Sequence, residues 1–137
     1  MLRVVRSVFA ALLVLSLMAS TVMAGSPHFV SLSVTRDGNS LVAQGKEAGL
    51  GNEDQVHIVV TATAECINPG DHHPKAANKE TVSAEGDFPV QNGKANFSLT
   101  LTATFQPDCT PPMTVVFTDV TVTDVTNGIS RSFPGTF

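Results

Sequence analysis

The feature that most constrains the fold is an alternation of apolar and polar residues in two long stretches of the chain. In residues 55–66 and again in residues 94–106, nearly every second position is apolar. These positions are Val56, Ile58, Val60, Ala62, Ala64 and Cys66 in the first stretch, and Phe97, Leu99, Leu101, Ala103 and Phe105 in the second. Successive side chains of a β-strand point to opposite faces of the sheet. The pattern therefore predicts strands with one face in a core and a Thr-rich face toward solvent.

Weaker alternation continues through the rest of the chain, and no segment after residue 24 shows a helical period. In the first of the weaker segments, Val30, Leu32 and Val34 are expected to face the core. We expect about seven strands, at residues 29–36, 40–45, 55–66, 80–90, 94–106, 114–126 and 129–134. This number of short strands predicts an all-β, antiparallel two-sheet sandwich of the immunoglobulin or fibronectin type, with a small open barrel as the alternative.

Turn and bulge signals mark the points at which the strands are interrupted. Asn92-Gly93 and Asn127-Gly128 predict type I′ hairpin turns, because both central residues of that turn need positive φ. The apolar parity changes between Phe117 and Val120, which predicts a β-bulge near Thr118-Asp119.

Residues 1–24 have the pattern of a secretory signal peptide. Two arginines precede a short apolar run, and small residues stand at the positions before a cleavage site at Ala24-Gly25. The run is shorter than the ~20 residues that a membrane-spanning helix needs. We therefore expect a mature domain of residues 25–137 that is extracellular or periplasmic and is not inserted in a membrane.

The charge balance limits the classes of partner. The chain has 8 basic and 12 acidic residues, and the predicted signal peptide contains two of the arginines and no acidic residue. The mature domain would therefore be acidic, which argues against nucleic acid as a partner. At 42% apolar residues the chain is also too apolar to be disordered.

The chain has two cysteines, Cys66 and Cys109. They follow the third and fifth predicted strands, which run in the same direction if strands alternate, so both cysteines reach one end of the sandwich. In an oxidising compartment this arrangement predicts a Cys66–Cys109 disulfide. Two cysteines without Cys-x-x-Cys spacing are a poor metal site.

The same end carries the two most irregular loops, residues 67–79 and 106–113, both rich in proline. Long loops in a small domain are commonly functional. We therefore expect them to form the contact surface for an unknown extracellular partner, either a protein or a surface polymer. The candidate binding residues are Asn68, Asp71, His72, His73, Pro74 and Asp108.

Asp71, His72 and His73 also form the densest cluster of potential zinc or copper ligands. Side chains of adjacent histidines diverge, however, so a solvated polar loop is the preferred interpretation and no cofactor is predicted. The other histidines do not complete a site, because His28 belongs to the opposite end and His57 faces outward in mid-strand.

Acidic residues gather at the opposite end of the predicted sandwich. They lie in Asn52-Glu53-Asp54, at Glu85 and Asp87, and at Asp124 close to Asn127. Loop carboxylates of this kind can hold calcium, but no EF-hand spacing is present. We expect these residues to serve turns and solubility.

Three short motifs carry a resemblance to other proteins. Gly49-Leu50-Gly51-Asn52 leads into a strand that ends in Cys66-Ile67-Asn68-Pro69-Gly70, and Cys109 precedes Phe117-Thr118-Asp119-Val120. In this combination the chain resembles a group of small secreted bacterial proteins of uncharacterised function. The resemblance covers most of the mature chain and departs from the group at Asp71-His72-His73. It implies the fold and the localisation, and it implies no ligand, activity or catalytic residue.

These observations predict a secreted, disulfide-stapled β-sandwich that acts as a binding or structural module and not as an enzyme. No Gly-x-Ser-x-Gly motif is present, and oxidised cysteines cannot serve as thiolate nucleophiles. One alternative is a metal-binding protein, enzymatic or ion-sequestering, that uses His72 and His73 with a nearby carboxylate. A further alternative is a small extracellular protease inhibitor that presents the same loop.

Overall fold

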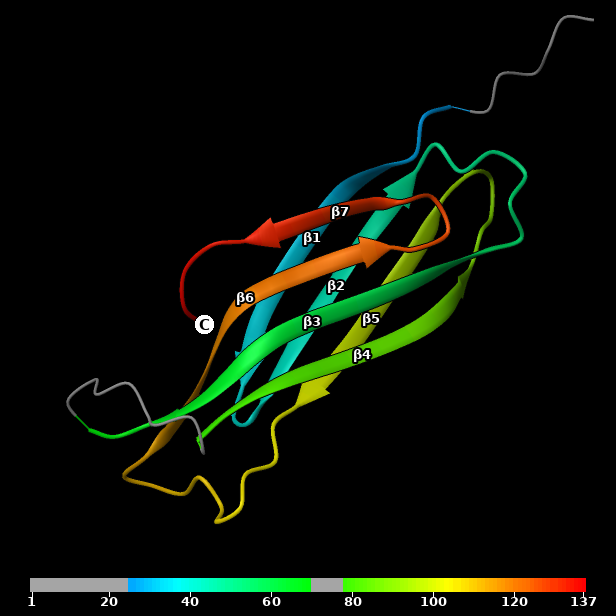
Figure 1. Cartoon of the computed structure of the whole chain (residues 1–137). Helices are drawn as coiled ribbons and strands as arrows, with labels where there is room; N and C mark the ends of the chain where they lie inside the picture. The colour runs from blue at the N-terminus through cyan, green and yellow to red at the C-terminus, as the bar shows by residue number, and fades with distance from the viewer. Residues whose placement is uncertain (1–24, 70–77) are drawn as a thin grey trace, which may run out of the picture.

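The computed structural model of the chain describes residues 25–69 and 78–137 (Figure 1). These residues form seven β-strands, as the alternation predicted. The strands are β1 (His28–Asp37), β2 (Ser40–Ala48), β3 (Gln55–Ile67), β4 (Lys79–Pro89), β5 (Ala95–Thr102), β6 (Thr114–Asp124) and β7 (Ile129–Phe133). Within the described part of the chain, no helix is long and apolar enough to cross a membrane.

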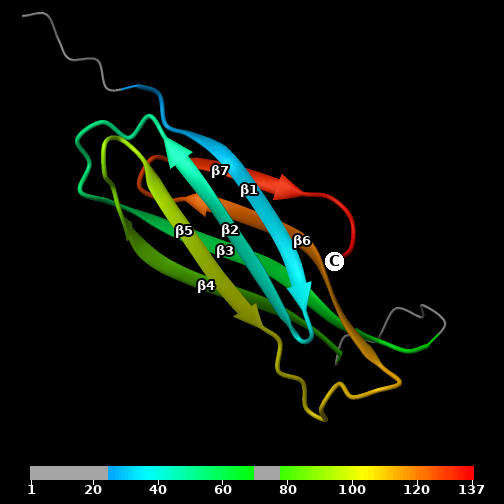
Figure 2. The same cartoon turned by 180° about the vertical axis from the view of Figure 1, so that it is seen from behind.

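The strands form two antiparallel sheets that pack face to face (Figures 1 and 2). One sheet has the order β1-β2-β5 and the other has the order β4-β3-β6-β7. The structure is therefore a two-sheet sandwich, as predicted, and not the alternative small barrel. Strand β4 pairs with β3, whereas in a constant-type immunoglobulin domain the fourth strand belongs to the sheet of the first two strands.

The predicted inward faces form the core. All six inward positions of β3, from Val56 to Cys66, are at most 4% exposed. On and after β5, Phe97, Leu101, Ala103 and Phe105 are buried and Leu99 is partly buried. The period of two thus identified the core side of both strands correctly.

Two bulges shift the inward and outward positions within strands. Thr61 of β3 pairs with Thr121 of β6, but Thr63 pairs with Thr118, so Asp119 and Val120 together oppose one residue of β3. Asp119 has a φ of 51°. This confirms the predicted bulge, which returns Val120 to the core.

The bulge in β1 was not predicted, and it makes one expectation wrong. Phe29 pairs with Glu47 and Ser31 pairs with Lys46, which leaves Val30 without a partner in the ladder. Val30 is 55% exposed instead of facing the core. Phe29 packs inward in its place, with its ring centroid 6.1 Å from that of Phe97.

The two Asn-Gly turns have different outcomes. Asn92 and Gly93 both have positive φ, as a type I′ turn requires. At Asn127-Gly128 only Gly128 has positive φ, and the Gly128 amide donates a hydrogen bond of 2.9 Å to the carbonyl of Asp124. The second connection is therefore a four-residue loop over residues 125–128, because Asp124 and Ile129 form the last pair of the β6–β7 ladder.

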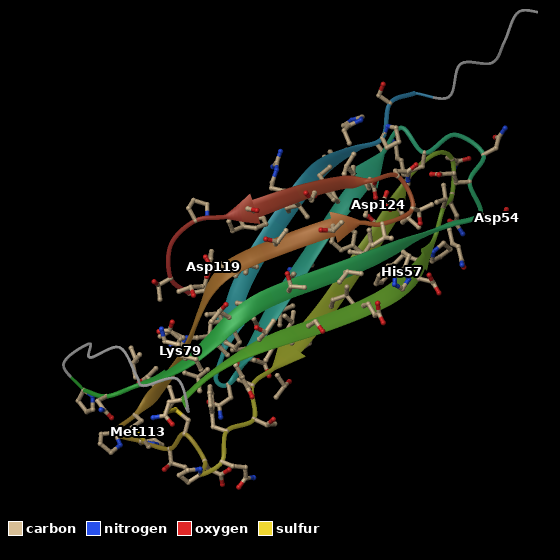
Figure 3. The ribbon with its side chains drawn as sticks, in the orientation of Figure 1. Asp54, His57, Lys79, Met113, Asp119 and Asp124 are labelled. Carbon is tan, nitrogen blue, oxygen red and sulfur yellow. A yellow bond between two sulfur atoms is a disulfide. The ribbon has the colours of Figure 1, made fainter. Side chains whose placement is uncertain are left out.

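The antiparallel order places all connections at two opposite ends (Figure 1). The cystine end holds Cys66, Cys109 and the β1–β2 turn. The acidic end holds the β2–β3 loop, the β4–β5 turn and the β6–β7 loop. Figure 3 shows Lys79 and Met113 near the first end, and Asp54, His57 and Asp124 toward the second.

Candidate functional site

A disulfide bond between Cys66 and Cys109 covalently joins the end of β3 to the β5–β6 connection. The two Cα atoms are 5.8 Å apart, and the residues are 4% and 8% exposed. The Met113 Sδ atom lies 3.8 Å from the Cys66 Sγ atom and covers the bridge. The predicted disulfide is therefore confirmed, and it leaves the chain without a free thiol.

The connection between β5 and β6 is also held by hydrogen bonds and by buried side chains. The Ala103 amide donates to the Asn39 carbonyl over 2.9 Å, and the Thr104 amide donates to Glu80 Oε1 over 2.7 Å. Ala103 and Phe105 are buried beneath it. The first part of the connection is thus fixed to the β1–β2 turn and to β4 before the disulfide fixes it to β3.

Polar side chains stand on this fixed connection. Gln106, Asp108 and Thr110 are exposed, and they line a hollow of about 370 Å³ together with Asn39, Ala103, Thr104, Phe105 and Cys109. Of the predicted binding residues, Asp108 therefore lies in this hollow, and Asn68 is exposed just after β3. Asp71, His72, His73 and Pro74 lie outside the described residues.

The described residues of the cystine end provide no metal site. Glu65, which the alternation placed on the solvent side, is only 7% exposed and pairs with Lys79 over 3.4 Å. In residues 25–69 and 78–137, no three or more His, Cys, Asp or Glu side chains are grouped so that they could hold a metal ion. The hypothesis of a metal bound by His72 and His73 thus rests on residues whose placement is not described.

The acidic end contains a compact group of carboxyl side chains. Asp124, at the end of β6, and Glu47, at the end of β2, are both fully buried. The Asn127 Nδ2 atom donates to Asp124 Oδ2 over 2.6 Å and to Glu53 Oε2 over 3.1 Å. Glu53 and Asn127 also line a hollow of about 660 Å³ beside the segment that leads into β1. The predicted proximity of Glu53, Asp124 and Asn127 is therefore correct.

Glu47 is the member of this group that the sequence analysis missed. It has the same parity as the buried residues Leu41 and Ala43 of β2 and therefore points inward, but it lies beyond the predicted end of this strand at residue 45. No hydroxyl or N–H group among the described residues donates to either of its carboxyl oxygens. The signal that could have identified Glu47 was an acidic residue on the side of the strand where the other residues are apolar.

Burial raises the pKa of Glu47 to about 8, and the neighbouring carboxyl group of Asp124 and the negative charge of Glu53 act in the same direction. Two carboxylates have no proton with which to bond each other. A hydrogen bond between the two groups would need a proton, and Glu47, with a pKa near 8, carries one at neutral pH.

A second set of carboxylates, on the outer face of the β4-β3-β6-β7 sheet, surrounds His57. The His57 Nδ1 atom is 2.8 Å from Asp87 Oδ1, and the Nε2 atom is 3.0 Å from Glu85 Oε2. These hydrogen bonds, first with Glu85 and then with Asp87, raise the pKa of His57. Because each carboxylate contacts a different ring nitrogen, the three groups do not converge on one point, and His57 makes two separate side-chain contacts. The predicted outward direction of His57 is correct.

Comparison of the chain with protein-family models, with curated protein sequences and with solved structures gave no match.

Proposed function

We propose that the protein acts outside the cytoplasm, after removal of residues 1–24, as a secreted or periplasmic binding or structural module of the immunoglobulin-like class. In this proposal it is not an enzyme, and its partner is an extracellular protein or surface polymer that contacts the cystine end. The observation that carries the proposal is the disulfide, because disulfides form and persist in oxidising compartments.

The geometry of the connection supports a contact surface here. Backbone amides of this connection donate to the Asn39 carbonyl and to the Glu80 carboxylate and fix one part of it, and the Cys66–Cys109 bond fixes the next. Ordering a loop before it meets a partner lowers the entropic cost of binding. The exposed side chains of Gln106 and Asp108 are therefore presented on a fixed backbone.

A site-specific photo-crosslinker tests this surface. We would place it at Gln106 on the cystine end and, as the matched control, at the exposed residue Thr100 on the outer face of β5. After irradiation in the native envelope or culture fluid, the proposal expects a discrete adduct from the Gln106 position and none from the Thr100 position. Equal adducts at both positions, or none at either, would contradict it.

The same material distinguishes the two alternatives. A protease inhibitor would give an adduct whose partner is a protease, with cleavage or protection mapped to residues 67–79. A metal-binding protein would bind zinc or copper in a titration of the mature chain, and the binding would be lost on substitution of His72 and His73 by Ala.

A further inference from the structure

The outer face of the β1-β2-β5 sheet carries a polar groove near the acidic end. Two hollows, of about 460 Å³ and 340 Å³, share Lys46 and Asn96 along their walls and so form one continuous depression. The polar side chains that define it are Gln44, Lys46, Gln91, Asn92, Lys94 and Asn96, and we call it the lysine groove. Its combined volume is within the range of ~300–1,000 Å³ that ligand sites occupy.

The strand register explains why these side chains gather. Lys46 of β2 pairs with Asn96 of β5, so both point to the same outer face. Lys94 precedes Asn96 by two residues and follows the tight turn at Asn92-Gly93, where the isolated bridge between Gln91 and Lys94 closes the hairpin. The turn thus places the ammonium group of Lys94 on the same outer face, next to Lys46 and Asn96.

No described acidic residue pairs with the lysines of the groove. Three lysines fall within the described residues, and Lys79 is paired with Glu65 at the other end. Lys46 and Lys94 make no ion pair or hydrogen bond with another described side chain, and no carboxylate lines either hollow. In an otherwise acidic protein, both unpaired lysines of the described chain therefore line one depression.

The remaining lining groups indicate the class of ligand. Amide side chains both donate and accept hydrogen bonds, which matches the hydroxyl groups of a sugar. Peptide-binding sites usually bury aromatic or aliphatic anchors in deep apolar pockets. These hollows are open, and amide, hydroxyl and ammonium side chains line them beside the apolar residues Leu32, Phe97 and Pro89. We infer that the lysine groove binds an anionic polysaccharide, with acidic groups on Lys46 and Lys94 and hydroxyl groups on the amides of Gln44, Gln91, Asn92 and Asn96.

This inference does not rest on the proposed contact surface at the cystine end, because the two sites share no residue and lie at opposite ends of the sandwich (Figure 2). A failure at Gln106 in the crosslinking experiment leaves the lysine groove untested, and the reverse also holds. The two proposals are therefore decided by separate measurements.

Affinity electrophoresis of the folded mature protein tests the inference. The probe is polygalacturonate, a polymer of carboxylate-bearing sugars, and the comparison polymers are neutral dextran and poly-glutamate. The test variant is K46Q/K94Q. The matched control is K79Q/R131Q, which removes the same charge from exposed or partly exposed positions outside the groove.

We expect polygalacturonate to retard the wild-type protein and the control variant, with an effect that weakens as salt rises. The K46Q/K94Q variant should bind about tenfold more weakly, as expected for the loss of two charge-assisted contacts, with an unchanged melting temperature. Absence of retardation, equal retardation by dextran, or equal binding by K46Q/K94Q would overturn the inference. Lysine-dependent binding of poly-glutamate as tight as that of polygalacturonate would assign the groove to an acidic peptide instead.

Discussion

Substitution of Glu47 by Gln should make the protein more stable at neutral and alkaline pH. Glu47 is fully buried, and no group of the described residues forms a hydrogen bond with its carboxyl oxygens. An amide at this position has nearly the same shape and can donate a permanent hydrogen bond to Asp124. The substitution therefore removes the ionisation of a buried carboxyl group without leaving a cavity.

The sign and size follow from the two pKa values of Glu47. The carboxyl group ionises near 4.5 in the unfolded chain and at about 8 in the folded protein. Between these values the folded state holds one proton more, so the free energy of unfolding falls as pH rises, by about 1.4 kcal/mol per pH unit. Stability from this group is complete below pH 4.5 and is lost by pH 8. At pH 7 the loss is on the order of 3 kcal/mol, a sizeable part of a small domain's stability.

Urea unfolding from pH 5 to pH 8.5 measures this effect. The wild-type protein should lose stability across the range, and E47Q should have a flatter profile and exceed the wild type by roughly 4 kcal/mol at pH 8. D54N is the matched control, because Asp54 is an exposed acid in the neighbouring loop (Figure 3), and its profile should follow that of the wild type. Parallel profiles for wild type and E47Q would refute the assignment of the proton to Glu47.

Three further perturbations follow from the structure. Reduction of the Cys66–Cys109 bond, which closes a separation of 43 residues, should lower the free energy of unfolding by ~4 kcal/mol on the chain-entropy model, and urea unfolding with and without reductant would show it. A loss below ~1 kcal/mol would contradict the model. Gly45→Ala should destabilise by ~1–3 kcal/mol in thermal unfolding, because a Cβ would lie 2.6 Å from a Leu32 methyl carbon; an unchanged melting temperature would contradict this packing. The NMR titration midpoint of His57 should lie above 6.5 and should fall in D87N. The contacts of His57 with Glu85 and Asp87 should stabilise the protein at pH values below 6.5 and lose this effect as pH rises through the midpoint. A midpoint unmoved by D87N would contradict the contribution of Asp87 to the raised pKa.

The sequence predicted the fold well because each strand signal is local. Alternation identified the core face of β3 from residues two apart, and the parity change near Asp119 located a bulge within one strand. The failures are also local. The bulge at Val30 follows Phe29 without a visible parity change, and the four-residue loop at Asn127 depends on where the β6–β7 ladder ends.

The sites were predicted less completely because they join residues far apart in the chain. Glu47 and Asp124 belong to different sheets, so their contact depends on how the two sheets pack as well as on the parity of each strand. The pairing of Lys46 with Asn96 depends on β5 lying next to β2, which alternation does not specify. Glu85 and Asp87 lie on β4, within the strand predicted at residues 80–90, but their contact with His57 depends on the β3–β4 register, which places Asp87 opposite His57.

Strand β2 carries both Glu47, which is protonated at neutral pH, and Lys46 of the lysine groove. Lys46 and Glu47 are neighbours on this strand, so their side chains leave opposite faces of the sheet, one into the groove and one into the core. A charge on Glu47 would oppose that of Lys46, because a buried charge is less screened than an exposed one. With its proton in place, Glu47 adds no negative charge to those of Asp124 and Glu53. The same burial that makes Glu47 costly to ionise therefore avoids a further negative charge behind the proposed lysine groove.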